Sequence, residues 1–164
     1  MPESEDERWM RHALVEAGSA LKKGEVPVGA VVVYENKIIG RGHNQTEGLN
    51  DPTAHAEIIA IGAAATYLKS WRLSGASLYV TIEPCAMCAG ALVLSRMDRL
   101  VFGSKDPKAG ACGSLYNIVQ DIRLNHQLEI VPYILEKECS QMLRAFFEKL
   151  RQRSREGKKE SKSG

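Results

Sequence analysis

The stretch SLYVTIEPCAMCAGALVLSRMDRLVFG, residues 77–103, predicts the central unit of the fold. Residues 77–82 and 99–103 are short apolar runs that contain β-branched and aromatic side chains, as strands do. Pro84 lies between them and opens a helical segment, AMCAGALVLSR. A strand, a helix and a second strand in this order form a parallel pair with a right-handed crossover, so the stretch predicts an α/β fold.

The residues before this unit predict a helix and an antiparallel pair of strands. Ser4 and Glu7 have the spacing of a capping box, and apolar residues then recur at helical spacing over residues 5–23. VPVGAVVVY and KIIGRGHN predict two strands, 26–34 and 37–44, which are joined by a tight turn.

Three further elements complete the expected sheet and its helices. A helix is expected from about residue 54, because Asp51 and Pro52 in the loop GLNDPT can start it. LEIVPY at 128–133 predicts the last strand, and the apolar stripe of residues 135–150 predicts a long amphipathic helix. Together these elements predict a five-stranded mixed sheet with helices on both faces.

The chain has the size of one domain. Its 164 residues can close a single core, so one domain over 1–164 with a basic helical tail from about residue 151 is expected. We expect no membrane association, since no segment is apolar enough to span a bilayer and the acidic N-terminus is unlike a signal peptide. Four cysteines without framework spacing suit the reducing cytoplasm, where a close pair more often binds metal than forms a disulfide.

Positive charge is concentrated at the C-terminal end of the chain. The formal net charge of +2 is by itself too small to imply a nucleic-acid partner. From residue 144 onward, eight basic residues face three acidic ones, so this segment carries +5 and residues 1–143 carry −3. A basic terminal run of this kind is either a solvated helix end or a surface that meets phosphates.

Two cysteines and a histidine have the spacing of a zinc site. Cys85 and Cys88 lie three residues apart in the first turn of the predicted helix, so both sulfurs can reach one ion. His55 stands at another predicted helix start and is the best remaining ligand. Three protein ligands leave the fourth tetrahedral position for water, which is the pattern of a catalytic zinc. A structural zinc site and a redox-active cysteine pair are the alternatives.

Glu57 provides the separate acid–base group that such a zinc needs. Two thiolates and a neutral histidine cancel the charge of the ion, and Glu57 lies two residues from His55 in the same helical turn. It would take the proton of a zinc-bound water and pass it to a ring nitrogen and then to the departing amine. Because HxE followed by PCxxC is the signature of zinc deaminases that act on nucleobases, the sequence predicts hydrolytic deamination.

Nearly the whole chain resembles the bacterial tRNA-specific adenosine deaminases, a family of the cytidine deaminase-like superfamily. HxE and PCxxC define only the superfamily, whereas longer motifs are typical of this family. These motifs are EVPVGAVVV at 25–33, DPTAHAE at 51–57, LYVTIEPCAMCAGA at 78–91, SRMDRLVFG at 95–103, NH at 125–126 and FF at 146–147. The resemblance implies a three-layer α/β/α sandwich, one zinc ion per subunit and a homodimer. It also implies conversion of adenosine to inosine at the wobble position, 34, of a tRNA anticodon, typically that of an arginine tRNA.

The same resemblance implies roles for the four residues of the metal motif. His55, Cys85 and Cys88 match the zinc ligands of the family, and Glu57 matches its proton shuttle. These roles agree with those that the spacing of the residues favours.

Three further residues match contacts to the RNA. Asn44 matches a residue that hydrogen-bonds the flipped base, with an ordinary turn asparagine as the alternative. Asp106 matches a contact to the sugar of the target nucleotide, with a cap or turn former as the alternative. Phe147 would place a flanking base, whereas Phe146, on the apolar stripe, is expected in the core.

The basic C-terminal helix favours an RNA substrate, the anticodon stem-loop of a tRNA. Proteins bind single-stranded loops by base stacking and by basic groups that follow the backbone. Phe147 followed by Arg151, Arg153 and Arg155 can supply both. Two other functions stay open: deamination of free guanine, cytosine or cytidine, and a non-catalytic, zinc-stabilised RNA-binding module.

Overall fold

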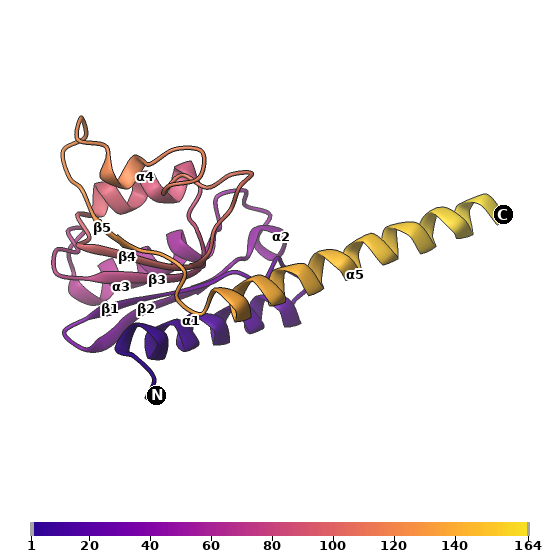
Figure 1. Cartoon of the computed structure of the whole chain (residues 1–164), viewed down its shortest axis with the longest axis horizontal. Coiled ribbons are helices and arrows are strands. Elements are labelled where there is room, and N and C mark those ends of the chain that lie inside the picture. Colours follow the sequence, from indigo (N-terminus) through magenta and orange to yellow (C-terminus); the bar gives the residue numbers. More distant parts are fainter. Residues whose placement is uncertain (1, 164) are drawn as a thin grey trace.

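A five-stranded mixed sheet lies at the centre of the computed structural model, which describes residues 2–163 (Figure 1). The strand order is β2-β1-β3-β4-β5. β1 pairs antiparallel with β2 and with β3, whereas β3, β4 and β5 run parallel, which confirms the predicted mixed sheet and its parallel pair. The strands are β1 (Gly29–Tyr34), β2 (Lys37–His43), β3 (Ser77–Ile82), β4 (Arg99–Ser104) and β5 (Glu129–Val131).

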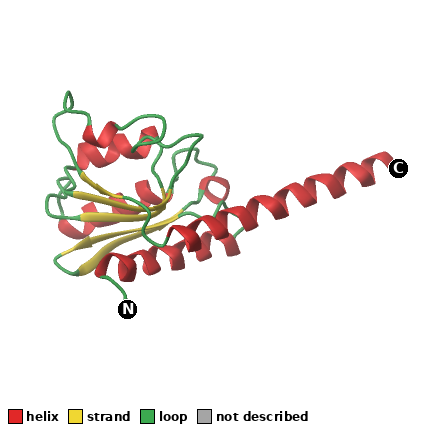
Figure 2. Cartoon of the chain, in the orientation of Figure 1, coloured by secondary structure: helices red, strands yellow, loops and turns green. Residues whose placement is uncertain are grey.

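Helices cover both faces of this sheet (Figure 2). α1 and α5 pack on one face, and α3 and α4 pack on the other, so the α/β/α sandwich is confirmed. The helices are α1 (Glu5–Lys22), α2 (Thr46–Leu49), α3 (Ala56–Leu68), α4 (Ala86–Ser95) and α5 (Glu136–Ser163), with a short 3-10 helix, η1 (Ile118–Gln120). Among residues 2–163, none of the helices combines the length and the apolar character needed to cross a bilayer.

The central strands contribute side chains to two separate cores. Ala30 and Val32 of β1 pack in the core under α3 and α4, and Val31 and Val33 pack in the core under α1. Alternate side chains of a strand point to opposite faces, so a continuous apolar run is what a strand covered on both faces requires.

Two glycines let α3 approach the sheet closely. A Cβ atom at Gly42 of β2 would lie 2.2 Å from the carbonyl oxygen of Ala56, and one at Gly40 would lie 2.3 Å from that of Ala60. Only glycine permits this approach of a helix to a strand. The contact fixes the N-terminal turn of α3 against the sheet, and His55 is the cap of that turn.

The observed elements differ from the predicted ones at several boundaries. The first strand begins at Gly29 instead of residue 26, and the last covers Glu129–Val131 instead of 128–133. The helix expected from about residue 54 begins at Ala56, because the Asp51 side chain accepts hydrogen bonds from the N–H and hydroxyl groups of Thr53 and holds these residues in a turn.

Only the first half of α5 packs against the sheet. Cys139 and Leu143 are buried, whereas Leu150 is 50% exposed, and beyond it the helix projects away from the body (Figure 1). The expectation that Phe146 belongs to the core is wrong. It is only partly buried and lines a groove with Leu21 of α1.

Asp6, Tyr79 and Arg99 form a polar network that joins α1 to β3 and β4. The Tyr79 hydroxyl donates to Oδ1 of Asp6 at 2.7 Å, and the Arg99 guanidinium donates to Oδ2 of Asp6 at 3.1 Å. Burial raises the pKa of Asp6, but the hydrogen bonds from Arg99 and Tyr79 outweigh it and lower the pKa below 3.8. The ionised Asp6 therefore stabilises the folded state at pH values above its pKa.

We expect Asp6→Asn to lower the free energy of unfolding by about 1–2 kcal/mol at pH 7, because it replaces a charged acceptor in a partly exposed site. The pKa of Asp6 is lowered in the folded protein, so the contribution of its carboxylate to the free energy of unfolding is lost as the pH falls through this lowered pKa. Urea denaturation should therefore give converging stabilities for the two proteins well below pH 3.8. Glu129→Gln, at the more exposed partner of Arg99, is the control and should have a smaller effect.

Candidate active site

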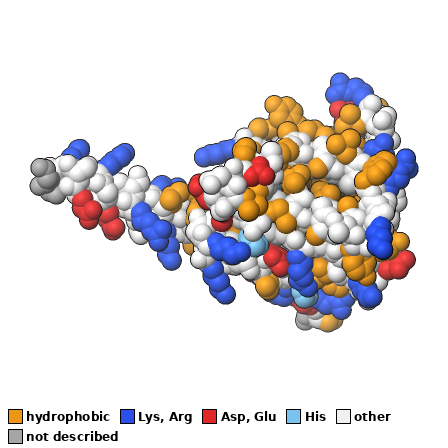
Figure 3. All heavy atoms as spheres, turned by 180° about the vertical axis from the view of Figure 1, so that it is seen from behind, with side chains coloured by type: hydrophobic (Ala, Val, Ile, Leu, Met, Phe, Trp, Pro, Cys, Tyr) orange, Lys and Arg blue, Asp and Glu red, His pale blue; other side chains and the backbone are white. Residues whose placement is uncertain are grey.

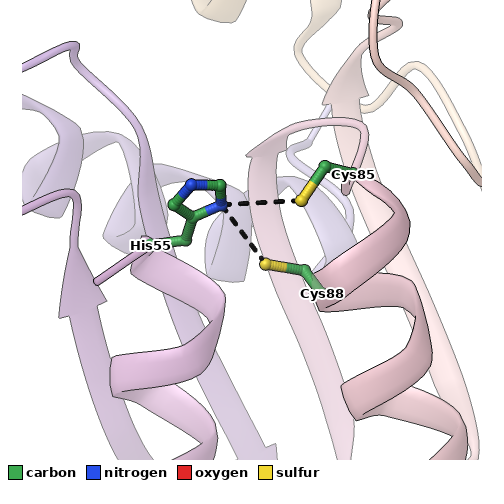
Figure 4. Close-up of side chains that lie close together, drawn as sticks. All are labelled: His55, Cys85 and Cys88. Carbon is green, nitrogen blue, oxygen red and sulfur yellow. Dashed lines mark hydrogen bonds between the residues drawn. The ribbon is translucent and has the colours of Figure 1, made fainter. Parts of the chain in front are cut away.

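Two helix N-termini bring the predicted metal ligands together. His55 caps α3, Cys85 caps α4, and Cys88 lies in the first turn of α4. Figure 4 shows the His55 ring pointing at both sulfurs, with Nδ1 3.6 Å from Sγ of Cys85 and 3.5 Å from Sγ of Cys88. All three ligand atoms lie within 4.8 Å of one another.

These separations fit a tetrahedral metal ion. A nitrogen at about 2.05 Å and a sulfur at about 2.3 Å from zinc, at the tetrahedral angle, lie about 3.6 Å apart. The two observed distances from His55 Nδ1 match this value. His55, Cys85 and Cys88 are thus a metal-binding triad of the type found in zinc deaminases, and they leave one position for a fourth ligand.

The triad favours thiolate at Cys85. Hydrogen bonds with Cys88 and His55 lower the pKa of Cys85 to about 3. The hydrogen bond with Cys85, together with burial, raises the pKa of Cys88. A hydrogen bond with Cys85 also raises the pKa of His55. Both cysteines also lie at the positive end of α4, which stabilises a negative sulfur.

Glu57 is a buried carboxylate beside this triad. It is the second residue of α3 and only 3% exposed. Burial raises its pKa to about 7, although the charge of the His55 ring acts in the opposite direction. A carboxyl group with this pKa can both accept and release a proton near neutral pH.

A cavity of about 800 Å³ opens beside the triad. Asn44, His55, Glu57 and Cys85 line it, together with apolar side chains from the segments that precede β1 and end β3. The loop after β4 and one face of α5 contribute Asp106, Pro107, Lys108, Ala109, Leu143, Arg144, Phe147 and Arg151, and Thr46, Ala56 and Glu83 also line the cavity.

Asn44 has an unpaired acceptor in the wall of this cavity. The residue is 8% exposed, and its Nδ2 group donates to the carbonyl oxygen of Val26 at 3.4 Å. Its Oδ1 atom is buried without a hydrogen-bond partner among the described residues. An unpaired buried acceptor costs free energy, so this atom suits a ligand that carries a donor.

Asp106 forms the turn that its residue type favours and also lines the cavity. Its Oδ1 atom accepts hydrogen bonds from the N–H groups of Lys108 at 3.0 Å and Ala109 at 3.2 Å. The alternative of a turn-forming aspartate is therefore confirmed, and it does not exclude a contact with a ligand, since Asp106 is among the lining residues.

Only the first part of the basic tail lies at the cavity. Phe147 and Arg151 line it, one helical turn apart, whereas Arg153 and Arg155 are exposed farther along α5 and do not line it. Sequence reasoning missed Arg144, which also lines the cavity. Its spacing of three from Phe147 and seven from Arg151 places all three on one helix face, a signal that was present in the sequence.

Two further buried glutamates were also missed. Glu25 accepts hydrogen bonds from the N–H groups of Glu47 and Gly48, both at 2.9 Å, and so holds the short α2. Glu83 accepts hydrogen bonds from backbone N–H groups of the loop after β4. Burial raises the pKa of Glu83, but these hydrogen bonds, led by that of Ser114, outweigh it and lower the pKa.

Comparison with known proteins agrees with this architecture. Residues 4–151 match the model of the MafB19-like deaminase family. The chain is 51% identical to a tRNA-specific adenosine deaminase of Bacillus subtilis, over 95% of this chain and 97% of that protein. It is 50% identical to the tRNA-specific adenosine deaminase of Haemophilus influenzae, over 90% and 86% of the two chains.

A solved structure from a study of A-to-I editing by tRNA:A34 deaminases at the wobble position superposes with a TM-score of 0.80. It is 44% identical in sequence, and the match covers 83% of this chain and 99% of that one. A similarity of this size over most of both chains means that the two proteins share the same fold. By sequence and by fold, the chain belongs to the family of tRNA-specific adenosine deaminases.

Proposed function

We propose that this protein deaminates adenosine hydrolytically to inosine at the wobble position, 34, of a tRNA anticodon, typically that of an arginine tRNA. The observation that carries this function is the metal triad with the buried Glu57 beside it, since His55, Cys85 and Glu57 line one cavity. Relatives that are about half identical to this chain are named tRNA-specific adenosine deaminases, and a solved structure that is 44% identical comes from a study of tRNA:A34 deaminases.

The metal in this proposal is zinc, one ion per subunit, held by His55, Cys85 and Cys88. Two sulfurs and one imidazole nitrogen are ligands that bind zinc, whereas magnesium and calcium prefer oxygen ligands. When bound, zinc supplies hydroxide at neutral pH by lowering the pKa of water to about 7.

Glu57 moves the protons of the reaction. Its raised pKa, about 7, lets the carboxylate take a proton from water and the carboxylic acid return it at the same pH. The first proton goes to a ring nitrogen of adenine. The second, from the hydroxyl group that water adds to the reacting carbon, goes to the amine, so that the C–N bond breaks, ammonia leaves and inosine remains.

Asn44, Asp106 and Phe147 would position the target nucleotide. The unpaired Oδ1 atom of Asn44 would accept a hydrogen bond from the flipped base. Asp106 would contact the sugar, and the half-exposed ring of Phe147, at the cavity wall, would stack against a flanking base.

Parallel incubations test this function against small-molecule deamination. The zinc-loaded protein is given an anticodon stem-loop with adenosine at position 34, free adenosine, guanine, cytosine and cytidine. We expect inosine from the stem-loop alone. Conversion of a free compound with an untouched stem-loop would instead make the protein a small-molecule deaminase.

The basic face of α5 would follow the RNA backbone. Arg144 and Arg151 line the cavity on either side of Phe147, and α5 continues outward from there (Figure 1). We expect deletion of residues 151–164 to weaken stem-loop binding, with bound zinc unchanged. For every phosphate that the shortened helix no longer neutralises, the slope of log affinity against log salt should flatten by about 0.7.

Single substitutions in the tail give matched controls for that truncation. Arg151→Gln should weaken binding more than Arg153→Gln, although both remove one charge, because residues two apart in a helix point about 200° apart. Fluorescence anisotropy at several salt concentrations measures both effects. Equal affinities and slopes for the truncated and full-length proteins would contradict a role of the tail.

We also propose that the protein is a cytoplasmic homodimer. Figure 3 shows hydrophobic side chains gathered on one face of the body. On or next to α3 and α4, Tyr67, Trp71 and Leu94 are 57%, 62% and 70% exposed, more than a solvated surface favours for such large apolar groups. Among residues 2–163, none of the four cysteines is paired in a disulfide, which suits the reducing cytoplasm.

Light scattering tests the dimer directly. We expect a molar mass twice the 18.1 kDa of the chain, and Leu94→Glu should lower it toward that of the monomer. Val15→Glu is the matched control, since Val15 is 65% exposed on α1, on the other face of the sheet. A monomeric wild-type protein at micromolar concentration would contradict the proposal.

A further inference from the structure

Glu83 is a buried carboxylate that the proton chemistry does not use. It follows β3 directly, lies two residues before Cys85, and is only 2% exposed. Burial of a carboxylate is unfavourable unless hydrogen bonds replace the lost water. The partners of Glu83 therefore indicate what it is there to hold.

All of these partners come from one loop, residues 105–117, which follows β4. Oε1 accepts from the N–H of Asp106 at 3.0 Å and from the hydroxyl of Ser114. Oε2 accepts from the N–H groups of Cys112 and Ser114, both at 3.0 Å. One side chain thus gathers four donors from residues up to eight positions apart in the loop.

The loop is shaped around this carboxylate. A Cβ atom at Gly110 would lie 2.3 Å from Oε2 of Glu83, so the backbone passes too close for any side chain at this position. Because every partner is a donor, the site requires an acceptor at both oxygens. Glutamine has the same shape, but its NH₂ group would face at least one N–H donor in either orientation, that of Asp106 or those of Cys112 and Ser114.

The residues that this loop presents to the cavity include Asp106 and Lys108. The Asp106 side chain is in turn fixed by the N–H groups of Lys108 and Ala109. Since the Asp106 backbone is anchored by Glu83, the position of its carboxylate depends on Glu83 as well. The chain of contacts runs from the segment that carries Cys85 to the loop that lines another part of the cavity.

We infer that Glu83 is a positioning residue: its carboxylate sets the loop after β4 so that Asp106 meets the target nucleotide. This inference rests on the proposed function, in which Asp106 contacts the substrate. The Glu83 side chain connects the segment that carries Cys85 to the loop that carries Asp106. Loss of the carboxylate should therefore weaken substrate placement without removing the metal.

The first test does not depend on activity. Amide hydrogen exchange, followed by NMR on zinc-loaded protein, compares the wild type with Glu83→Gln. We expect faster exchange at Asp106, Cys112 and Ser114 in the variant. Glu25→Gln is the matched control, because its carboxylate holds the amides of Glu47 and Gly48, and exchange should rise there instead.

The second test is a double-mutant cycle on stem-loop deamination. Glu83→Gln should lower kcat/KM about tenfold or more, mainly through KM, with unchanged zinc content. In an Asp106→Ala background it should change kcat/KM by less than about twofold, whereas the effect of Glu25→Gln should add in full. Ser114→Ala, which removes one donor, should give the same pattern more weakly if Glu83→Gln fails to fold.

The outcomes separate the two proposals. Unchanged exchange at the three loop amides, or full additivity of Glu83→Gln with Asp106→Ala, would overturn the positioning role. A fall in kcat alone, with KM unchanged, would mean that Glu83 acts on the chemical step and not on substrate placement, and would also overturn it. A wild-type protein that leaves the stem-loop untouched would refute the proposed function, and the exchange experiment would then decide the role of Glu83.

Discussion

Replacement of Glu57 by glutamine should lower the rate of stem-loop deamination by about 10² to 10⁴, the usual contribution of a general acid–base group. Glutamine keeps the size of the buried side chain but can neither take a proton from water nor return one. The effect should fall on kcat, because in the proposed mechanism Glu57 acts on the reacting protons, while the remaining cavity residues would still bind the RNA. Single-turnover measurement of inosine formation gives the value directly.

Metal analysis of the Glu57 variants supplies the control for this result. Glu57→Gln and Glu57→Ala should both retain one zinc per chain, since Glu57 is not part of the triad. Unchanged activity with zinc in place would contradict the catalytic role, and a wild type that binds the stem-loop without deaminating it would favour a zinc-stabilised RNA-binding module. The comparison thus separates an enzyme from a binding module.

Replacement of Cys88 by alanine should abolish zinc binding and, with it, all measurable deamination. Cys88 is fully buried and its sulfur lies 3.5 Å from Nδ1 of His55, whereas alanine at this position has no donor atom for a metal ion. The wild type should also lose stability on chelation of its zinc, by about 4 kcal/mol if free zinc had been at 1,000 times the dissociation constant. Metal content and thermal unfolding, measured together, check both effects.

Cys139→Ala is the matched control for Cys88→Ala. Cys139 is also a buried cysteine, at 1% exposure, but it packs in the other core beneath α1 and α5. This variant should lose some stability to the cavity it leaves, yet keep its zinc and its activity. Re-addition of zinc should restore the chelated wild type and leave Cys88→Ala inactive; rescue of Cys88→Ala by zinc would contradict the assignment of this ligand.

Features that depend on local spacing could be predicted from the sequence. The period of apolar residues and the position of Pro84 sufficed for the strand, helix and strand of residues 77–103. The metal triad followed because His55 and Cys85 both cap helices, and helix starts leave clear signals in a sequence. The mixed sheet followed from the order of these elements.

Features held by distant side chains could not be predicted. α2 is only four residues long and its N–H groups are held by Glu25, which lies 22 residues before Glu47 in the chain. The loop after β4 has no periodic sequence pattern that could predict its course, and its backbone N–H groups are held instead by the distant side chain of Glu83. Phe146 continues the apolar stripe of α5, but it lies partly exposed in a groove with Leu21 of α1 and not in the core.

The most direct test of the central claim is a reaction in H₂¹⁸O with an anticodon stem-loop that carries adenosine at position 34. After nuclease digestion, mass spectrometry identifies the product and the position from which it came. Hydrolytic deamination at this site predicts inosine at position 34 with one solvent-derived ¹⁸O atom, and adenosine unchanged elsewhere. Unmodified adenosine at position 34, or inosine without the solvent oxygen, would contradict the account.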